Sequence, residues 1–251
     1  MPDNVINFSD NAVACRQCSL HGMCLPPSID RSTQEILDSA IRKRRPVARG
    51  DVLYRSGEPL DAIYCVRSGS IKTYSTSNDG SEMVTGFHLP GELLGLTGFS
   101  TNQSHCTAVA LETSSICEIP FDRLGELTQK IPSLQKELMR LLSGKILHYQ
   151  NLMLLVGRKS AEERVAALLF SLSKRFKSRG FSAAEFYLSM SRNDIANYLG
   201  LAVETVSRVF TRFDEDGLLT VRRKYIHILD MERLHQLAGN PISEQQLSAF
   251  S

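Results

Sequence analysis

The sequence lacks any long uninterrupted apolar run. A membrane-spanning helix needs roughly 18 or more apolar residues in succession. The 251 residues contain no such run. The start of the chain, MPDNVINFSD, also lacks the basic residues and apolar core of a secretory signal. We therefore expect a cytoplasmic protein with no membrane partner. In that compartment cysteine clusters are more typical of metal or redox chemistry than of structural disulfides.

The motifs of several large enzyme classes are also missing. The sequence contains no P-loop, no G-x-S-x-G nucleophile motif and no dinucleotide-binding fingerprint. Its strand-rich part offers no recognisable pair of acid and base groups. The sequence therefore predicts a protein that is not an enzyme.

Charge is distributed unevenly although the net charge is only +2. Residues 1–157 carry 15 Lys or Arg and 16 Asp or Glu, whereas residues 158–251 carry 14 and 11. A basic excess in the C-terminal part is expected if that part meets a phosphate backbone.

Cysteines are concentrated near the N-terminus. Cys15, Cys18 and Cys24 follow the spacing C-x2-C-x5-C within CRQCSLHGMC, and Cys117 comes about a hundred residues later. The triplet precedes every periodic apolar pattern, so filling a core does not explain it. Thiolates suit zinc or an iron–sulfur cluster. Structural zinc sites usually use two close pairs of ligands, so an uneven set of three plus one favours the cluster.

Residues 46–121 have the pattern of short strands. Alternating runs such as AIYCVRSGSIKTYS and MVTGFHL are separated by Gly, Asn, Asp and Pro. Asn78-Asp79-Gly80 between two of these runs is a hairpin signal. The pattern predicts a compact antiparallel β-roll or sandwich. Before it, the S-x-x-E pattern from Ser32 to Glu35 predicts a short helix at 32–43.

A long helix is predicted from Pro132 to about residue 157. Its apolar side chains recur at a 3-4-3-4-3 spacing, which is typical of the seam between two helices. The alternative is a helix that packs only on its own domain. Because the helix separates two domains, we favour a homodimer. The seam residues are Met139, Leu142, Ile146, Tyr149, Met153 and Val156.

Residues 192–211 fit a helix-turn-helix. Ser191 is suited to cap the first helix, and Gly200 supplies the positive φ that the tight turn requires. The second helix presents Glu204, Ser207 and Arg208 on one face, because positions i, i+3 and i+4 are neighbours. Arg can bind guanine, Glu can accept from cytosine, and Ser can contact either edge in the major groove.

A short hairpin follows the second helix, with a basic turn that we expect to contact DNA phosphates as a wing. Its residues are Arg222, Arg223 and Lys224. The alternative for the preceding helix is a solvated helix that Glu204 and Arg208 stabilise as an i, i+4 pair. The helix-turn-helix register, the wing and the seam together favour DNA binding.

The order of these segments resembles the CRP/FNR superfamily of transcription regulators, and within it the oxygen-sensing FNR/Anr-type branch. The resemblance covers nearly the whole chain after the first ten residues. It is carried by CRQCSLHGMC, GFHLPGELLG, ALETSSICEIPF, AEERVAALLFSLSKRF and NYLGLAVETVSRVF. The last segment is the most specific, because E-x2-S-R is the recognition-helix signature of that branch.

The resemblance implies a [4Fe-4S] cluster held by Cys15, Cys18, Cys24 and Cys117, and a homodimer that binds TTGAT-type inverted repeats in double-stranded DNA. It implies control of anaerobic-metabolism genes, as activator or repressor, with RNA polymerase as a further partner. Cys65 and Cys106 match no ligand position. Cys65 lies in an alternating strand pattern, where a small buried side chain is expected.

Two other regulators on the same scaffold remain as alternatives. One responds to a cyclic nucleotide or another small ligand, since Gly91 to Gly95 resembles the start of a phosphate-binding cassette. Such relatives supply an Arg-Ser pair shortly afterwards, but this chain has Ser104-His105 and no arginine between 68 and 122, so a cyclic phosphate would lack a buried cation. The other is a regulator stapled by structural zinc.

The expected fold class is α+β. The expected organisation is a cysteine-rich cluster-binding segment at 1–29 and an antiparallel β-roll of the cyclic-nucleotide-binding type at 30–131. A dimerisation helix at 132–157 and a winged helix-turn-helix DNA-binding domain at 158–251 follow.

Overall fold

The computed structural model describes residues 18, 36, 38–43 and 46–239. Two of the predicted cluster ligands, Cys15 and Cys24, lie outside the described residues, and so does the predicted helix start from Ser32 to Glu35.

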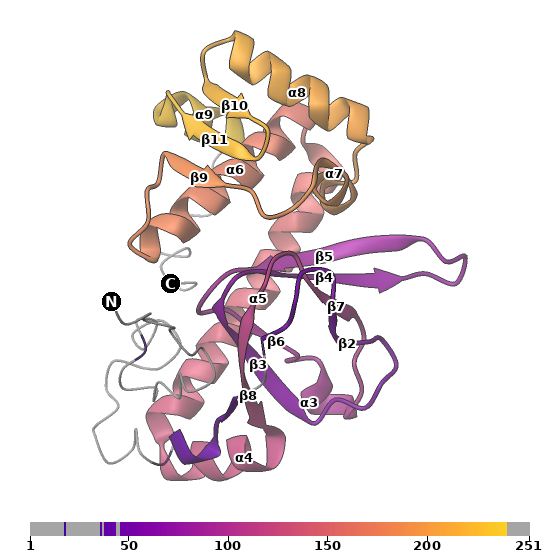
Figure 1. The fold of residues 1–251 in the computed structure, drawn as a ribbon, viewed down its shortest axis with the longest axis vertical. Helices are drawn as coiled ribbons and strands as arrows, with labels where there is room; N and C mark the ends of the chain where they lie inside the picture. Colours follow the sequence, from indigo (N-terminus) through magenta and orange to yellow (C-terminus); the bar gives the residue numbers. More distant parts are fainter. Residues whose placement is uncertain (1–17, 19–35, 37, 44–45, 240–251) are drawn as a thin grey trace, which may run out of the picture.

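Two antiparallel sheets form the N-terminal domain (Figure 1). One has the strand order β1-β8-β3-β6 and the other the order β2-β7-β4-β5. Their apolar side chains share one core, in which Leu60, Ile71 and Ile116 are fully buried. The predicted antiparallel β-roll is confirmed. Its strands are β1 (Arg42–Lys43), β2 (Val52–Tyr54), β3 (Ala62–Ser68), β4 (Ile71–Thr76), β5 (Glu82–His88), β6 (Leu93–Leu94), β7 (Thr107–Ala110) and β8 (Ser115–Pro120).

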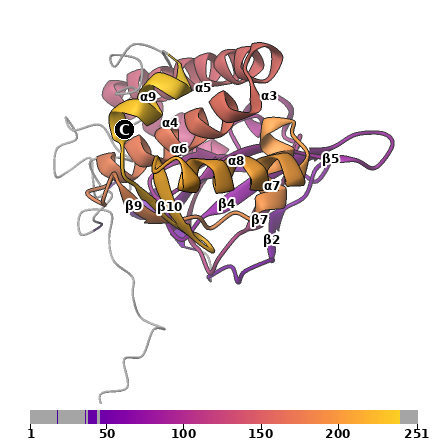
Figure 2. The same cartoon turned by 90° about the horizontal axis from the view of Figure 1, so that it is seen from above.

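The predicted hairpin turn joins β4 to β5. Asp79 Oδ1 accepts a hydrogen bond from the backbone N–H of Ser81 at 3.0 Å, and Gly80 has a φ of 82°, which few residues other than glycine adopt. Seen from above, the tip of this hairpin extends beyond the rest of the molecule (Figure 2).

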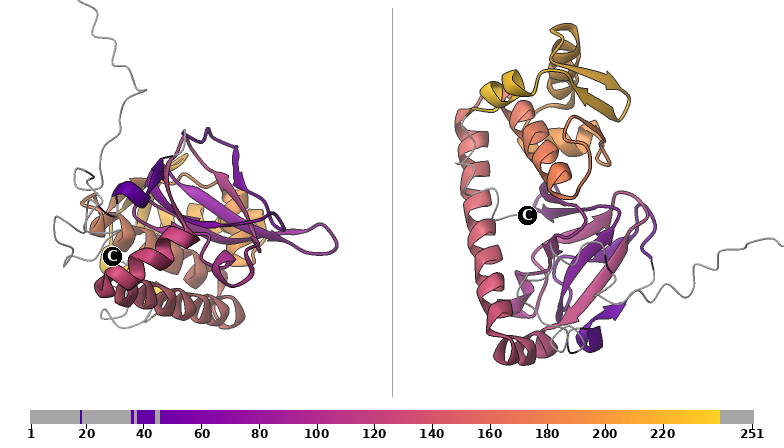
Figure 3. Two further views of the ribbon diagram at one scale, coloured as in Figure 1. Left: turned by 90° about the horizontal axis from the view of Figure 1, so that it is seen from below. Right: turned by 90° about the vertical axis from the view of Figure 1, so that its left-hand side faces the viewer.

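One short helix lies within the roll, and two helices follow it. The short helix α3 (Gly98–Thr101) lies within the roll, and α4 (Phe121–Lys130) leads into α5 (Pro132–Arg158). Pro132 stands in the first turn of α5, where a missing N–H costs nothing. The long helix predicted at 132–157 is therefore confirmed, with one further residue. It runs along one side of both domains (Figure 3, right).

The C-terminal domain packs helices around one core with a small sheet of order β10-β11-β9. Ser160 and Glu163 form a capping box that begins the first of these helices. The predicted winged helix-turn-helix is confirmed. Its elements are α6 (Ala161–Ser178), β9 (Glu185–Tyr187), α7 (Arg192–Leu199), α8 (Val203–Glu215), β10 (Leu219–Arg222), β11 (Tyr225–Ile228) and α9 (Met231–Ala238).

The helix predicted at 32–43 is wrong at its C-terminal end. Ile36 and residues 38–40 are helical, but Arg42–Lys43 forms β1, which pairs with β8. Strand pairing with a distant segment overrides the local pattern there. The helices α3, α4 and α9 and the strand β9 were not predicted. β9 has only three residues, of which only Phe186 is buried, and α9 follows the wing closely. Among the described residues, we find no helix that combines the length and the apolar character of a membrane span.

Candidate sensor and nucleic-acid-binding sites

The turn between α7 and α8 has the geometry that the sequence predicts. Ser191 Oγ accepts from the backbone N–H of Asp194 at 3.1 Å, and Asp194 Oδ2 accepts from the backbone N–H of Ser191 at 2.9 Å. Gly200 ends α7 with a φ of 62°. The capping box fixes where α7 begins, and Gly200 ends it two residues before Ala202, the N-cap of α8.

The helix α8 buries one face and exposes the other. Val206, Val209, Phe210 and Phe213 are buried in the domain core. Glu204, Ser207 and Arg208, the predicted base-contacting residues, are all exposed. Ser207 Oγ donates to the carbonyl of Val203 at 2.9 Å, so its hydrogen is used within the helix while its oxygen can still accept a hydrogen bond.

Glu204 and Arg208 do not form an ion pair. The alternative interpretation of α8, a solvated helix stabilised by this i, i+4 pair, required one. Arg208 Nη2 instead donates to Thr205 Oγ1 at 3.4 Å. The nearby Arg212 is ion-paired with Glu162 and lies 3.9 Å from Asp216. Neither Glu204 nor Arg208 therefore forms an ion pair with another described residue.

The wing turn is exposed and strained. Arg222, Arg223 and Lys224 are all exposed. Arg223 has a φ of 58°, a left-handed conformation that residues other than glycine adopt at a cost. Lys224 Nζ donates to the carbonyl of Ser189 at 2.7 Å, so part of its charge is directed to its own domain. Arg222 and Arg223 are the better candidates for phosphate contacts.

The predicted seam on α5 is largely uncovered in the single chain. Met139, Ile146, Tyr149 and Met153 are exposed, Met153 by 76%. Leu154, which the seam did not include, is exposed as well. Contiguous apolar exposure of this kind marks a binding surface.

Leu142 and Val156 differ from the other seam residues, since both are half-buried. A Cβ on Gly200 would lie 3.3 Å from Val156 Cγ1. The C-terminal end of α5 therefore touches the turn of the helix-turn-helix. Val156 therefore lies against the helix-turn-helix, whereas Met139, Ile146, Tyr149 and Met153 remain exposed.

Of the predicted cluster ligands, Cys18 and Cys117 are described. Cys117 lies on β8, whose burial alternates along the strand. Ile116 and Glu118 on either side are buried, while Cys117 is half-exposed and lies on the opposite, outer face of the sheet. No disulfide joins the described cysteines. A thiol held outward on a rigid strand suits a ligand shared with a separate segment. No three metal-binding side chains come together in the described residues, which omit two of the four ligands.

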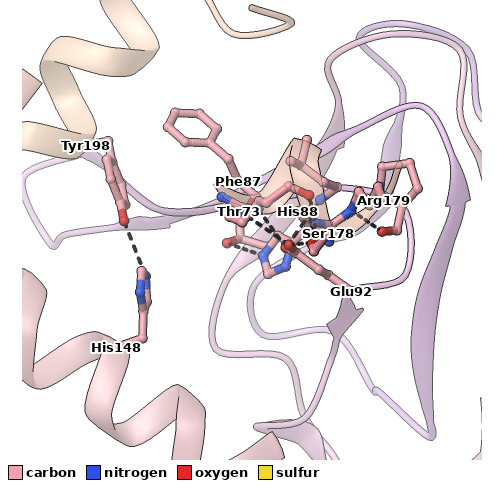
Figure 4. Close-up of polar contacts among 11 residues, drawn as sticks. Thr73, Phe87, His88, Glu92, His148, Ser178, Arg179 and Tyr198 are labelled. Carbon is pink, nitrogen blue, oxygen red and sulfur yellow. Dashed lines mark hydrogen bonds and ion pairs between the residues drawn. The ribbon is translucent and has the colours of Figure 1, made fainter. Parts of the chain in front are cut away.

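A buried ion-pair cluster that the sequence did not reveal joins the two domains. Glu92, between β5 and β6, accepts hydrogen bonds from Arg175 Nη2 at 2.6 Å and Arg179 Nη2 at 2.7 Å, both near the end of α6 (Figure 4). The side chain of Arg179 is only 1% exposed. Burial alone would raise the pKa of Glu92, but the two guanidiniums lower it to about 2. Glu92 therefore remains charged at neutral pH.

A second polar contact between the domains involves α7 and the roll. Lys72 Nζ donates to Asp194 Oδ1 at 2.6 Å. The amide of Asn197 accepts from the backbone N–H of Val84 at 2.5 Å and donates to the carbonyl of Glu82 at 2.6 Å. Asn197 thus provides hydrogen-bond partners for backbone groups on the outer edge of β5, a strand that pairs with another strand on one side only. The first helix of the helix-turn-helix is fixed to the β4–β5 hairpin.

Two histidines lie near this interface. His88 is buried, and burial followed by the charge of Lys145 lowers its pKa to about 3. His148 on α5 has a pKa lowered to about 4 by burial and the same lysine, and its Nε2 lies 3.3 Å from Tyr198 Oη (Figure 4). Both imidazoles are therefore neutral at pH 7. A cavity of about 570 Å³ separates this part of the roll from α5 and α6.

The structure does not favour a cyclic nucleotide as the ligand. Glu92, in the cassette-like loop, is held by arginines of the C-terminal domain. The roll itself supplies no arginine between 68 and 122. A cyclic phosphate in the roll would therefore lack the cation that its burial needs.

Comparison with known protein families matches both domains. Residues 44–130 match the family model described as cyclic nucleotide-binding domain, and residues 163–237 match the Crp-like helix-turn-helix domain. The structure of FixK2 from Bradyrhizobium japonicum is similar, with a TM-score of 0.73 and 30% identity, over 80% of this chain and 99% of that one.

Similar proteins cover nearly the whole chain. The transcriptional activator protein Anr from Pseudomonas protegens is 50% identical over 232 residues, which cover 92% of this chain and 95% of that protein. The fumarate and nitrate reduction regulatory protein of Escherichia coli K12 is 44% identical over 229 residues, or 91% of this chain and 92% of that protein. These names describe regulators and not enzymes. With its Crp-like helix-turn-helix, the chain is a transcriptional regulator that belongs to the Anr/FNR family.

Proposed function

We propose that this regulator responds to oxygen through a [4Fe-4S] cluster bound by Cys15, Cys18, Cys24 and Cys117. The observation that carries the proposal is the position of Cys117. It is half-exposed on the outer face of β8, away from the core of the roll, where its thiolate can be shared with the N-terminal triplet.

The thiol donor set suits this group. Iron–sulfur clusters of this type take one cysteine thiolate per iron, and the four proposed ligands meet that number. When bound, the cluster supplies an oxygen-labile link between the N-terminal segment and the roll. The chain's own contribution is to hold Cys117 on a strand that pairs on both sides, with β1 and with β3, so that the fourth ligand has a fixed position.

We further propose that the active form is a homodimer joined through α5. The exposed side chains of Met139, Ile146, Tyr149 and Met153 offer an apolar stripe that a second copy of α5 can cover. The stripe is short, and Tyr149 brings a polar hydroxyl into it. A marginal dimer is easily shifted by a few kcal/mol, which suits a switch. We expect dimer with an intact cluster and mostly monomer after oxygen destroys it.

DNA binding then requires both copies. A single helix-turn-helix reads one half-site, and two-fold symmetry in the dimer matches an inverted repeat. We propose that Arg208 binds a guanine and that Glu204 and Ser207 set neighbouring preferences in a TTGAT-type half-site. Arg222, Arg223 and Lys224 contact phosphates. Bound near promoters of anaerobic-metabolism genes, the dimer activates or represses, and activation requires contact with RNA polymerase.

Replacement of single cysteines tests the ligand set. Cys117→Ala should abolish retention of iron and sulfide in anaerobically purified protein. Cys106→Ala is the matched control, because burial raises the pKa of the Cys106 thiol and its Sγ lies 4.0 Å from Tyr54 Oη, both unlike a ligand. A Cys117→Ala protein with its full complement of iron would refute the assignment. Zinc in place of iron would instead support a zinc-stapled regulator.

A further inference from the structure

Cys65 and Cys117 lie directly opposite each other in the roll, although they are far apart in the sequence. Cys65 is on β3 and Cys117 on β8, and the antiparallel register pairs them residue to residue. Opposite residues of an antiparallel pair project their side chains from the same face of the sheet. The two thiols therefore share the outer face of β3 and β8.

The hydrogen-bond pattern of this strand pair gives the spacing of the two backbones. The backbone N–H of Phe121 donates to the carbonyl of Asp61 at 2.7 Å, so the position of Asp61 is a hydrogen-bonded one. Such positions alternate along the strand, which makes Cys65 opposite Cys117 a hydrogen-bonded pair as well. Consistently, Val66 directs its N–H and carbonyl to Glu92 and Gly91 on the other side of β3.

Hydrogen-bonded opposite residues have Cα atoms about 5.5 Å apart. That value lies inside the roughly 4.4–6.8 Å range of disulfides, whereas the Cβ atoms, about 4.5–5.5 Å apart across strands, must approach slightly. The register shifts between Val66 and Ser68, one residue beyond Cys65. Such an irregularity weakens the ladder locally and lets the strands adjust.

The two thiols differ in access. Cys117 is half-exposed, whereas Cys65 is only 6% exposed. An oxidant from solvent reaches Cys117 first, and Cys65 lies next to it. This is the usual division between a thiol that is oxidised and a second thiol that resolves the product.

We propose that Cys65 and Cys117 form a redox-active dithiol that closes to a disulfide when Cys117 holds no metal. A peroxide first oxidises the Cys117 thiol to a sulfenic acid and releases water. The Cys65 sulfur then attacks the Cys117 sulfur, the S–O bond breaks, and the proton of Cys65 leaves with the hydroxide as a second water. The regulatory consequence rests on the proposed cluster: the disulfide withholds its fourth ligand until a thiol reductant restores it.

The first experiment does not depend on the cluster. In the full chain, all other cysteines are replaced so that only Cys65 and Cys117 remain, and the protein is treated with one equivalent of hydrogen peroxide. Thiol titration and peptide mass mapping should show loss of both thiols and an intramolecular link between the two peptides. The replacements are Cys15→Ser, Cys18→Ser, Cys24→Ser and Cys106→Ser.

Two matched variants complete this test. Adding Cys65→Ala should leave a sulfenic acid on Cys117 that dimedone traps. A variant with Cys106 and Cys117 as its remaining cysteines should form no internal link. The proposal is overturned if Cys117 stays trappable while Cys65 is present, or if the two peptides link only between chains.

The second experiment uses the otherwise unaltered chain. After air exposure, wild type and Cys65→Ala are given ferrous iron and sulfide without a thiol reductant, and cluster absorbance is followed. Arsenite is added to both proteins, because it reduces a sulfenic acid but not a disulfide. Wild type should then recover only after dithiothreitol is added, whereas Cys65→Ala should recover with arsenite alone. Equal recovery without dithiothreitol would refute the regulatory consequence. If neither protein ever takes up a cluster, the proposed function fails, while the first experiment still decides on the dithiol.

Discussion

Two exposed arginines of α8 differ in what their charges already contact. Arg212 is engaged by Glu162 and lies near Asp216. Arg208 meets only the neutral hydroxyl of Thr205 at 3.4 Å. Because its guanidinium has no carboxylate partner in the described chain, Arg208 can bind guanine without first breaking an ion pair. Both arginines lie on the exposed side of α8, so their positions along the helix do not distinguish them. Their ion-pair partners do.

Arg208→Ala should reduce discrimination at one base position of each half-site by about 1–3 kcal/mol, since a bidentate contact to guanine is worth that much. Competition binding with operator variants substituted at each position measures this. Arg212→Ala is the control and should leave the preference at that position unchanged. Equal losses of Arg208→Ala on operator and random DNA would contradict direct readout.

Arg223 is held in a left-handed conformation with a φ of 58°. Arg223→Gly should stabilise the folded protein by roughly 1 kcal/mol, because a left-handed side-chain residue costs about 1–2 kcal/mol. It should also weaken binding to all DNA sequences alike and flatten the salt dependence, since one phosphate contact is lost.

Thermal unfolding and salt titrations of DNA affinity measure the two effects of Arg223→Gly. Arg222→Ala removes the same charge without relieving a positive φ, so it should weaken DNA binding with no gain in stability. A stability gain in Arg222→Ala equal to that of Arg223→Gly would show that charge, and not backbone strain, is responsible.

At the scale of elements, α5 is the helix that contacts both domains and also carries the proposed dimer seam. It begins under the roll, reaches the helix-turn-helix through Val156, and exposes an apolar stripe between these ends. This stripe, from Met139 to Met153, is left open to solvent in the single chain, which favours a partner that covers it. In the proposed dimer, the contact of Val156 with Gly200 would connect α5 to the helix-turn-helix.

Ile146→Glu places like charges opposite each other in the proposed seam and should give monomers that retain the cluster but bind the operator poorly. Gln150→Glu introduces the same charge on an exposed position of the same helix, beside the seam, and should remain dimeric. Anaerobic sedimentation velocity measures both. A cluster-loaded Ile146→Glu protein that stays dimeric would rule out this seam.

Local elements follow from the sequence more fully than the contacts between them. The capping pair of Ser191 and Asp194, the turn at Gly200 and the buried face of α8 depend on neighbouring residues, so their pattern is visible in the chain. The strand β1 contradicts the predicted helix at 32–43 because its partner, β8, is distant in sequence. The pairing of Cys65 with Cys117 has the same origin, since register is set by the whole sheet.

At the scale of the whole molecule, charged residues of the two domains form ion pairs with one another. Glu92 was noted in the sequence only for its place in a cassette-like loop, yet in the fold it binds Arg175 and Arg179. Lys72 and Asp194 form the second such pair. No sequence pattern links these residues, because each partner belongs to a different domain. The Glu92 cluster ties the end of α6 to the roll, and the Lys72–Asp194 pair ties α7 to β4.

Glu92→Gln should destabilise the native protein by about 3 kcal/mol at pH 7, because it leaves two buried guanidiniums without a charge partner. The native pKa of Glu92 is lowered to about 2 from 4.5. Its stabilisation is therefore complete above about pH 4.5 and is lost as the pH falls towards 2. The difference between wild type and Glu92→Gln should shrink over that range.

Urea unfolding at several pH values measures this difference. Asp79→Asn is the control, because the pKa of Asp79 is also lowered to about 2, by hydrogen bonds in the exposed hairpin turn and not by a charge of the other domain. It should change domain docking little. A Glu92→Gln protein as stable as wild type at pH 7 would show that the ion-pair cluster does not hold the domains together.

The central claim, an oxygen-labile cluster on four cysteines, is tested most directly by the absorption spectrum of anaerobically purified protein, taken with iron and sulfide analysis and repeated after exposure to air. We predict a broad visible absorption with about four irons and four sulfides per chain, one iron for each proposed thiolate, and the loss of both in air. A colourless protein that contains zinc, or an iron–sulfur spectrum that persists unchanged in air, would contradict the account.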